Sequence, residues 1–255
     1  MSIELKRIEE FAVVTLNRPE ALNALSFSLI RELGQLFDRV AASDARALLI
    51  TGAGPKAFCA GADIKELAGR TLIPHKQGTE LGQWTFARLD RLPMPSVAIV
   101  NGYAFGGGLE LALACTTRIA TRNAKMGLPE IKLGLIPGYG GTQRLPRVVG
   151  EARALEMIMT GRTVDAEEAL RIGLVNRLVE GDPVAQGMAY AREFTCHSLP
   201  VLGFAREAVQ RALATPLSEG LRIEADLSTL AFQTRDSVEG MNAFMEKRKA
   251  RFEDR

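Results

Sequence analysis

Two glutamates could take part in proton transfer, because both lie in apolar surroundings. Glu110 comes directly before the apolar run 111–115, which places its carboxylate in the first turn of a helix that the sequence predicts to be buried. Glu130 has apolar residues on both sides. Burying a carboxylate is costly unless it is paired or used, and burial raises its pKa toward values that suit acid and base catalysis. An acid/base pair is one hypothesis, and the alternative is that each glutamate caps a helix or meets an arginine such as Arg144.

Glycines gather just before Glu110, in the segment Gly106-Gly107-Gly108. A buried strand is predicted before this segment and a helix after it. Glycine lets the backbone approach a ligand closely, and the start of a helix offers free N–H donors. The segment is therefore suited to stabilise an anion, including an oxyanion that forms only during a reaction. A tight strand-to-helix turn packed against another backbone would explain the same glycines.

A second glycine segment, 52–57, matches the GxGxxG/A pattern of dinucleotide-binding proteins. The residues after it, 58–62, break the helix that this fingerprint requires, and no acidic residue ends a strand about 20 residues later. A nicotinamide-dependent oxidoreductase is the alternative from a different class. It predicts an absorbance change when NADH is added.

Composition narrows the classes of protein. The chain has 255 residues, 47% hydrophobic and 24% charged, with a net charge of +2, which is typical of a globular protein without a broad nucleic-acid surface. Neither a membrane span nor a secretory leader is predicted, so we expect a cytoplasmic protein. Common zinc and serine hydrolase motifs are lacking, and we expect no metal site. A cysteine–histidine nucleophile is conceivable, but inert thiols explain Cys59, Cys115 and Cys196 more simply.

The elements that must position these residues alternate between strands and helices, which predicts an α/β fold. Two adjacent strands before the first helix, which Ser26 would cap, favour ββα units. Residues 68–82 resemble a mobile loop. The predicted strands are 3–8, 11–16, 47–54, 96–102, 117–121 and 174–179, and the predicted helices include 26–40, 84–92 and 109–115.

The last quarter of the chain contains only helical patterns. We therefore divide the chain into a core, 1–182, and a helical region, 183–255, that packs on the core or on a neighbouring subunit. Asp236 and Glu239 have capping-box spacing before a predicted helix, 240–251. The basic run Lys247–Arg251 is a solvated helix end or, in a non-catalytic protein, a surface that holds RNA.

Several ordered segments resemble the crotonase superfamily, and among its members the enoyl-CoA hydratases. They are FCAGADIKEL (58–67), NGYAFGGGLELALAC (101–115) and AKMGLPEIKLGLIPGYGGTQRLPR (124–147), with further similarity from residue 18 to residue 252. The resemblance implies a spiral of ββα units whose C-terminal helices form trimers or dimers of trimers. It also implies an acyl-CoA substrate, no metal and no redox cofactor, coenzyme A being part of the substrate.

The resemblance also assigns roles to residues. Two backbone N–H groups, of Ala62 and Gly107, would hold the thioester oxygen. Glu130 would give a proton to Cα, and Glu110 would orient and deprotonate the water that adds across the 2,3-double bond of a fatty-acid β-oxidation substrate. The residues expected to bind substrate and CoA are Ala24, Leu25, Ala60, Ala62, Asp63, Ile64, Lys65, Gly106 and Gly107.

Three alternatives within the family stay open: a hydratase for branched-chain or aromatic-pathway substrates such as methylglutaconyl-CoA, a 3-hydroxyacyl-CoA dehydratase in a synthetic pathway, and an enoyl-CoA isomerase. Acyl-chain length would be set by segment 68–82, and Lys247–Arg251 would contact CoA phosphates. The family's usual Asp-hydrophobic-Arg after Cys115 is replaced by Thr116-Thr117-Arg118, which puts one local polar contact in doubt.

Overall fold

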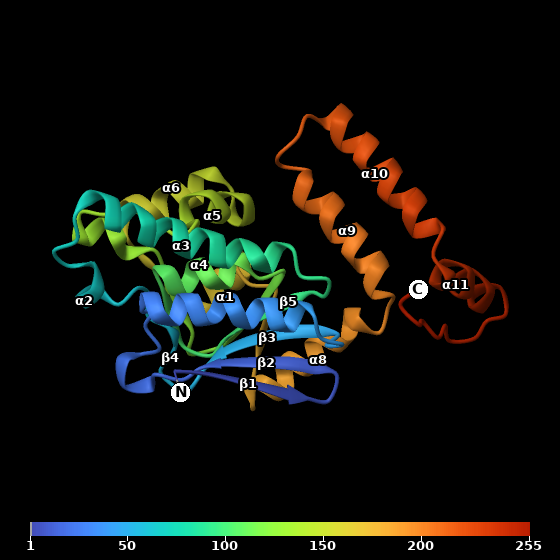
Figure 1. The fold of residues 1–255 in the computed structure, drawn as a ribbon, viewed down its shortest axis with the longest axis horizontal. Helices are drawn as coiled ribbons and strands as arrows, with labels where there is room; N and C mark the ends of the chain where they lie inside the picture. Colours follow the sequence, from blue (N-terminus) through green and yellow to red (C-terminus); the bar gives the residue numbers. More distant parts are fainter. Residues whose placement is uncertain (1) are drawn as a thin grey trace.

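The computed structural model describes residues 2–255 and contains two sheets (Figure 1). The larger sheet has the order β1 (Ile3–Ile8), β2 (Phe11–Leu16), β3 (Ala47–Gly52), β5 (Ser96–Val100), β7 (Thr117–Thr121) and β10 (Arg177–Val179). The smaller sheet has the order β4 (Ala57–Cys59), β6 (Tyr103–Phe105), β8 (Lys125–Gly127) and β9 (Thr163–Asp165). From β2 to β10 and from β4 to β8 all neighbours are parallel.

The helices follow pairs of strands. In order they are η1 (Pro19–Ala21), α1 (Phe27–Ala41), α2 (Ile64–Leu67), α3 (Leu72–Asp90), α4 (Gly107–Ala114), η2 (Pro129–Leu133), α5 (Gly141–Val149), α6 (Glu151–Thr160), α7 (Ala166–Arg171), α8 (Pro183–Thr195), α9 (Leu199–Arg211), α10 (Leu217–Phe232) and α11 (Arg235–Met245). Three times the chain passes through the large sheet and then the small sheet before it enters a helix: β3-β4-α2, β5-β6-α4 and β7-β8-η2. The predicted α/β fold of ββα units is confirmed.

Burial explains why these elements form. All residues of β3 and β5 are buried, as expected for parallel strands covered on both faces. Helix α1 begins where predicted, because the Ser26 hydroxyl accepts a hydrogen bond from Leu29 N at 3.1 Å. Its apolar stripe packs into the main core together with α4, whose eight residues are all buried.

Two local predictions were wrong, whereas the predicted lack of a dinucleotide-binding helix after Gly52 is confirmed. Most of segment 68–82 is not a loop, because α3 begins at Leu72 and continues through Pro74 and both of its glycines. Proline is accepted in a first turn, where its missing N–H would have no partner. As expected from residues 58–62, the segment after Gly52 does not form the helix that a dinucleotide site requires, and leads into strand β4. The cap of α11 is Thr234, not Asp236, whose carboxylate accepts hydrogen bonds from Glu253 N and Asp254 N.

After Cys115 this chain has Thr116 where the family usually has an aspartate, and hydroxyl groups make the local hydrogen bonds. Thr116 N donates to Ser96 Oγ at 3.0 Å, and Ser96 N donates to Thr116 Oγ1 at 3.1 Å. Arg118 is buried and donates to the carbonyl oxygens of Leu174 and Cys115. Burial lowers the pKa of this guanidinium. Backbone carbonyls and hydroxyl groups therefore supply the hydrogen-bond partners of this segment, and the aspartate that is usual in the family is not needed for them.

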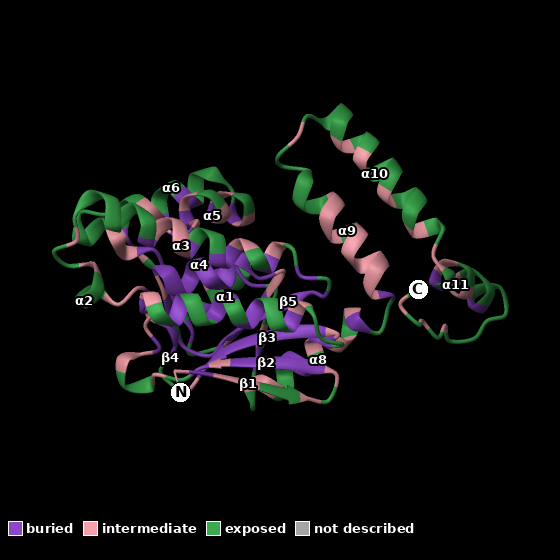
Figure 2. Ribbon diagram, viewed as in Figure 1, coloured by how far each residue is buried: buried purple, intermediate pink, exposed green. Residues whose placement is uncertain are grey.

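The C-terminal helices lie in two different settings. Helix α8 packs against β3 and β5 and contributes Met188 and Ala191 to a second core cluster. Helices α9 to α11 extend away from the sheets as an arm (Figure 1), and this arm is mostly exposed or half-buried (Figure 2). The division at residue 182 stays a prediction, since the segment that stands apart begins at Leu199. Among residues 2–255, no helix is both long and apolar enough to span a bilayer.

Candidate active site

The predicted site residues follow three neighbouring strands of the small sheet. Ala62 follows β4, Gly107 and Glu110 follow β6, and Glu130 follows β8. Because β4, β6 and β8 are parallel neighbours, their carboxyl ends lie at one edge of the sheet. One of these links is a hydrogen bond of 3.0 Å from Gly106 N to Gly127 O. The small sheet thus gathers residues that lie far apart in the sequence.

Two backbone N–H groups, those of Ala62 and Gly107, belong to residues that line the same cavity. Within the described residues, neither Ala62 N nor Gly107 N donates to a protein acceptor. Gly107 is the first residue of α4, so its free N–H also lies at the positive end of the helix dipole. A β carbon built on Gly61, whose φ is +108°, would lie 3.6 Å from Gly107 N and 2.9 Å from Phe105 O. Glycine at position 61 therefore lets the segment before Ala62 approach the start of α4 closely.

Glu110 is almost completely buried, with 1% of its surface exposed. Its Oε1 accepts hydrogen bonds from Tyr139 N at 2.8 Å and from Gly141 N at 2.7 Å. Because Gly141 is the first residue of α5, Glu110 does cap a helix, as the first alternative predicted. It does not meet Arg144, which pairs with Asp90. Burial raises the pKa of Glu110 to about 7, although the N–H donors favour the ionised form. That value suits a group that exchanges a proton near neutral pH.

Glu130 lies on η2 beside the same cavity. Its Oε2 is buried and has no hydrogen-bond partner among residues 2–255. Its Oε1 would lie 2.8 Å from a β carbon built on Gly106, whose φ is +50°, so a side chain at position 106 would collide with the carboxyl group. Burial raises the pKa of Glu130 above its usual range. A carboxyl with a raised pKa and an oxygen free of protein partners is suited to exchange a proton with a ligand.

A cavity of about 570 Å³ brings these groups together. Of the predicted residues it is lined by Ala60, Ala62, Ile64, Gly106, Gly107, Glu110 and Glu130. The remaining predicted residues, Ala24, Leu25, Asp63 and Lys65, do not line it.

Three of these four residues are nevertheless tied to its rim. Leu25 N donates to Gly61 O, and Asp63 N donates to Leu25 O. Arg18 holds the carbonyl of Ala24 and the carboxylate of Asp63. The segments around residues 24 and 63 therefore form one surface next to the cavity, while Lys65 is exposed on α2.

Sequence reasoning missed several residues of the cavity wall. Four of them come from the face of α3, from the loop before α5 and from the first turn of α5: Thr79, Gln83, Tyr139 and Thr142. The glycines around Tyr139 were a signal that could have pointed to this loop, because Gly140 has a φ of +118° and precedes a helix start. Segment 68–82, which contains Thr79, was expected to set acyl-chain length, but the incorrect loop prediction gave no sign that one face of a helix continues to Gln83.

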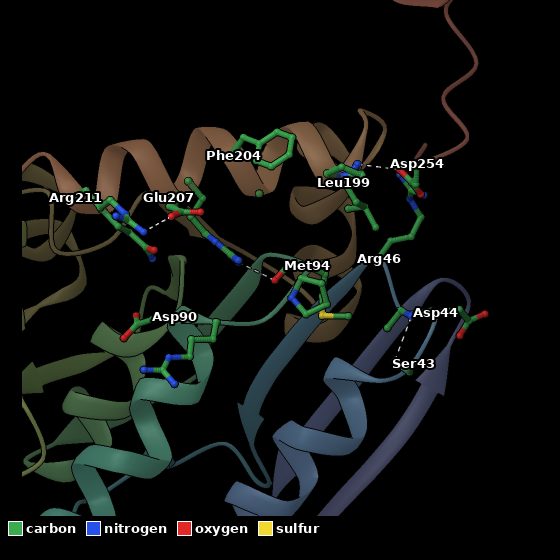
Figure 3. Close-up of a pocket in the computed structure, with 17 residues that line it drawn as sticks. Ser43, Asp44, Arg46, Asp90, Met94, Leu199, Phe204, Glu207, Arg211 and Asp254 are labelled. Atoms are coloured by element: carbon green, nitrogen blue, oxygen red, sulfur yellow. Dashed lines mark hydrogen bonds and ion pairs between the residues drawn. The ribbon is translucent and has the colours of Figure 1, made fainter. Parts of the chain in front are cut away.

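A second cavity, of about 830 Å³, lies between α9 and the loops that precede β3 and β5 (Figure 3). None of the predicted site residues lines it. Across it, Arg46 pairs with Asp254, and Arg206 donates to Met94 O at 2.9 Å. These contacts attach the arm to the core. Residues 2–255 contain no group of three or more histidine, cysteine or acidic side chains that could bind a metal ion, so neither cavity has such a group.

Comparison with known proteins decides the family. The model of the enoyl-CoA hydratase/isomerase family matches residues 7–255. The chain belongs to the enoyl-CoA hydratase/isomerase family. It is 45% identical to a probable enoyl-CoA hydratase of Rhizobium meliloti, with full coverage of both chains, and 40% identical to a crotonyl-CoA hydratase of Syntrophomonas wolfei, over 98% of this chain and 97% of the relative.

The fold comparison agrees. A crystal structure of an enoyl-CoA hydratase from Bacillus anthracis superposes with a TM-score of 0.95 at 36% identity, with full coverage of both chains. The resemblance and the crotonase-like spiral predicted from the sequence are confirmed. Membership of the enoyl-CoA hydratase/isomerase family makes this chain an enzyme.

Proposed function

We propose that this enzyme adds water across the 2,3-double bond of a 2-enoyl-CoA thioester to give a 3-hydroxyacyl-CoA, as in fatty-acid β-oxidation. The observation that carries the proposal is the meeting of two raised-pKa carboxyls with two free N–H donors in one cavity. The role of each residue is part of the proposal. The relatives that are named as enoyl-CoA hydratases support it.

Ala62 N and Gly107 N would bind the thioester carbonyl oxygen. Attack by water at Cβ shifts electrons toward this oxygen, which becomes enolate-like in the transition state. Donors fixed by the backbone need no reorganisation when that charge develops, and removal of one such donor costs about 100- to 1000-fold in rate. The CoA portion would then extend over Ala24, Leu25, Ala60 and residues 63–65.

The glutamates would divide the proton transfers between them. Water forms the C–O bond at Cβ while one of its protons passes to Glu110, and Glu130 gives a proton to Cα. Solvent then returns a proton from Glu110 to Glu130, so the net reaction consumes one water. The active pair therefore holds one proton in total. Each positioned acid or base contributes about 100- to 10,000-fold.

An isomerase is the second candidate, because it also acts on enoyl-CoA. Moving a double bond requires one group that removes and returns a proton, whereas the cavity contains two carboxyls, of which Glu110 is fixed by two N–H donors. This arrangement favours hydration. A branched or aromatic-derived substrate, and dehydration as the physiological direction, use the same groups and differ only in the acyl end or the direction of reaction.

Mass spectrometry of the product tests the proposal. With crotonyl-CoA we expect the product to gain the mass of one water and to co-elute with 3-hydroxybutyryl-CoA. Vinylacetyl-CoA distinguishes the isomerase, which would convert it to crotonyl-CoA without a change in mass. Added NADH and metal chelators should not alter the rate, since the reaction uses neither a redox cofactor nor a metal. Isomerisation without hydration would contradict the proposal.

The assembly and location of the enzyme belong to the same proposal. The arm exposes large apolar side chains, among them Leu217, Leu221 and Phe232, that a trimer or a dimer of trimers would cover. Arg248 pairs with Glu239 and Glu246 of its own chain, which leaves Lys247, Lys249 and Arg251 as candidates for CoA phosphates across a subunit boundary. The substrate would be a cytoplasmic acyl-CoA.

A further inference from the structure

Helix α3 contains two glycines, Gly78 and Gly82, on one face. Residues four apart lie above one another on a helix. Glycine in a helix interior is about 1 kcal/mol less favourable than alanine, so two of them on one face of a 19-residue helix call for a structural reason.

The reason is that two aromatic rings lie directly against this face. A β carbon built on Gly82 would lie 2.2 Å from Tyr139 Cδ1, and one built on Gly78 would lie 2.4 Å from Phe27 Cε1. Neither position has room for a methyl group. Phe27 and Tyr139 both line the cavity with the two glutamates. The glycines therefore let α3 close on the rings that shape the cavity wall.

Tyr139 is held from more than one side. A β carbon built on Gly107 would lie 3.0 Å from Tyr139 Cδ2, and the Phe86 ring meets the tyrosine edge-on, with centroids 5.8 Å apart and planes at 87°. Only 7% of Tyr139 is exposed. Gln83 Nε2 donates to Gly138 O at 2.9 Å, which ties α3 to the loop that carries the tyrosine. The ring thus fills the space between α3 and α4 and has no room to retract.

The place of Tyr139 along the substrate follows from the positions of the donors and the glutamates. The N–H donors of Ala62 and Gly107 receive the carbonyl, and the glutamates face the double bond. The rest of the cavity wall comes from two sides. Helix α3 contributes His75, Thr79 and Gln83, with Phe27 and Leu67 also in the lining, and the segment that leads into α5 and its first turn contribute Leu133, Leu135, Ile136, Pro137, Tyr139 and Thr142. The part of the acyl chain beyond the double bond has to pass along this remaining wall.

We propose that Tyr139, wedged against Gly82, forms the end wall of the acyl pocket and restricts the enzyme to short 2-enoyl chains. This inference rests on the proposed hydration reaction. The ring is rigid and bulky, so each methylene beyond the space in front of it would have to displace packed side chains. The backbone N–H of Tyr139 binds Glu110 whatever the side chain is, so the ring can be changed while that contact is kept.

The experiment compares kcat/KM for crotonyl-CoA, 2-octenoyl-CoA and 2-decenoyl-CoA in the wild type, Tyr139→Ala and the matched control Tyr139→Phe. One methylene in an apolar pocket changes specificity by about 10- to 200-fold. We therefore expect Tyr139→Ala to raise the octenoyl-to-crotonyl ratio at least about 10-fold, while Tyr139→Phe, which keeps the ring, keeps the wild-type ratio. Gly82→Ala should push the ring into the pocket and lower kcat/KM for crotonyl-CoA, and Tyr139→Ala in the same chain should relieve that loss.

The octenoyl-to-crotonyl ratio of kcat/KM distinguishes a ring that limits chain length from a ring that only packs in the core. A ring that only stabilises the fold would lower the melting temperature and slow all three substrates alike, and an unchanged ratio in folded Tyr139→Ala would overturn the inference. The wild type provides a test that needs no variant, since equal kcat/KM for decenoyl-CoA and crotonyl-CoA would also overturn it. Failure of the wild type to hydrate any enoyl-CoA would instead overturn the proposed reaction.

Discussion

Helices α4 and α10 differ sharply in how they use apolar residues. Every residue of α4 is buried between the sheets and neighbouring helices, whereas none of the residues of α10 is buried. Helix α10 nevertheless carries leucines that are more than half exposed, such as Leu217 and Leu221. The core buries its apolar side chains within one chain, whereas the arm leaves many of its apolar side chains exposed. This difference supports the proposal that the reaction takes place in the core and that the arm mediates assembly, since every residue that lines the smaller cavity lies between Phe27 and Thr142.

The largest effect should come from the two core carboxyls. We expect Glu110→Gln and Glu130→Gln each to lower hydration of crotonyl-CoA by about 100- to 10,000-fold, because each removes a proton-transfer group. CoA binding, measured by calorimetry, should change little. Glu151→Gln, at the exposed start of α6, is the control. Near-wild-type turnover in either site variant would remove that glutamate from the mechanism.

The next effect concerns the backbone of the same helix. Gly107→Pro removes one N–H donor and should reduce hydration by at least about 100-fold. Proline is tolerated in the first turn of a helix, so we expect the variant to fold. Circular dichroism checks this. Gly203→Ala, on α9 and outside the smaller cavity, controls for the loss of a glycine, because its backbone needs no left-handed φ and its surroundings have room for a methyl group. A folded Gly107→Pro enzyme with ordinary turnover would show that the glycine segment is only a packing turn.

Stability should move in the direction opposite to activity at Glu110. Its pKa is raised to about 7 from 4.5, so the folded state loses stability as pH rises through 7, and no loss occurs below 4.5. Glu110→Gln keeps an oxygen acceptor without the charge. We expect this variant to have a free energy of unfolding up to about 3 kcal/mol above that of the wild type at pH 8. Denaturant titrations at pH 8 and pH 4 test this, and an equal difference at both pH values would rule out the charge of Glu110 as its cause.

The smallest effect on turnover should come from the arm. Leu217→Asp with Leu221→Asp places two charges on the exposed apolar face of α10, and we expect light scattering to show a shift from trimer or hexamer toward monomer. Turnover per subunit should fall less than about 10-fold, because the arm contributes no residue to the smaller cavity. Asp226→Asn, on the opposite side of the same helix, is the control. A wild type that is already monomeric would contradict the assembly proposal.

Local patterns predicted the core well and its long-range contacts poorly. Ser26, the apolar run after Glu110 and the strand at 96–100 each carry a signal in neighbouring residues, and the structure places them as expected. The glycines of α3 read as loop residues, because their reason, a ring that is distant in sequence, is invisible in the local pattern. Asp236 was misread for a similar cause, since its partners are the backbone N–H groups of the chain's last residues.

The three ββα turns divide the chemistry into separately exchangeable parts. In the proposed mechanism, the first unit supplies the N–H donor of Ala62, the second supplies the N–H donor of Gly107 and the carboxyl of Glu110, and the third supplies the carboxyl of Glu130. Neighbouring strands in a sheet lie about 4.8 Å apart whatever side chains they carry, so the backbone sets the spacing between the groups that follow these strands. A substitution that changes the group at the end of one turn leaves the other two in place. Such a scaffold can acquire a new reaction through single replacements while its hold on the thioester persists.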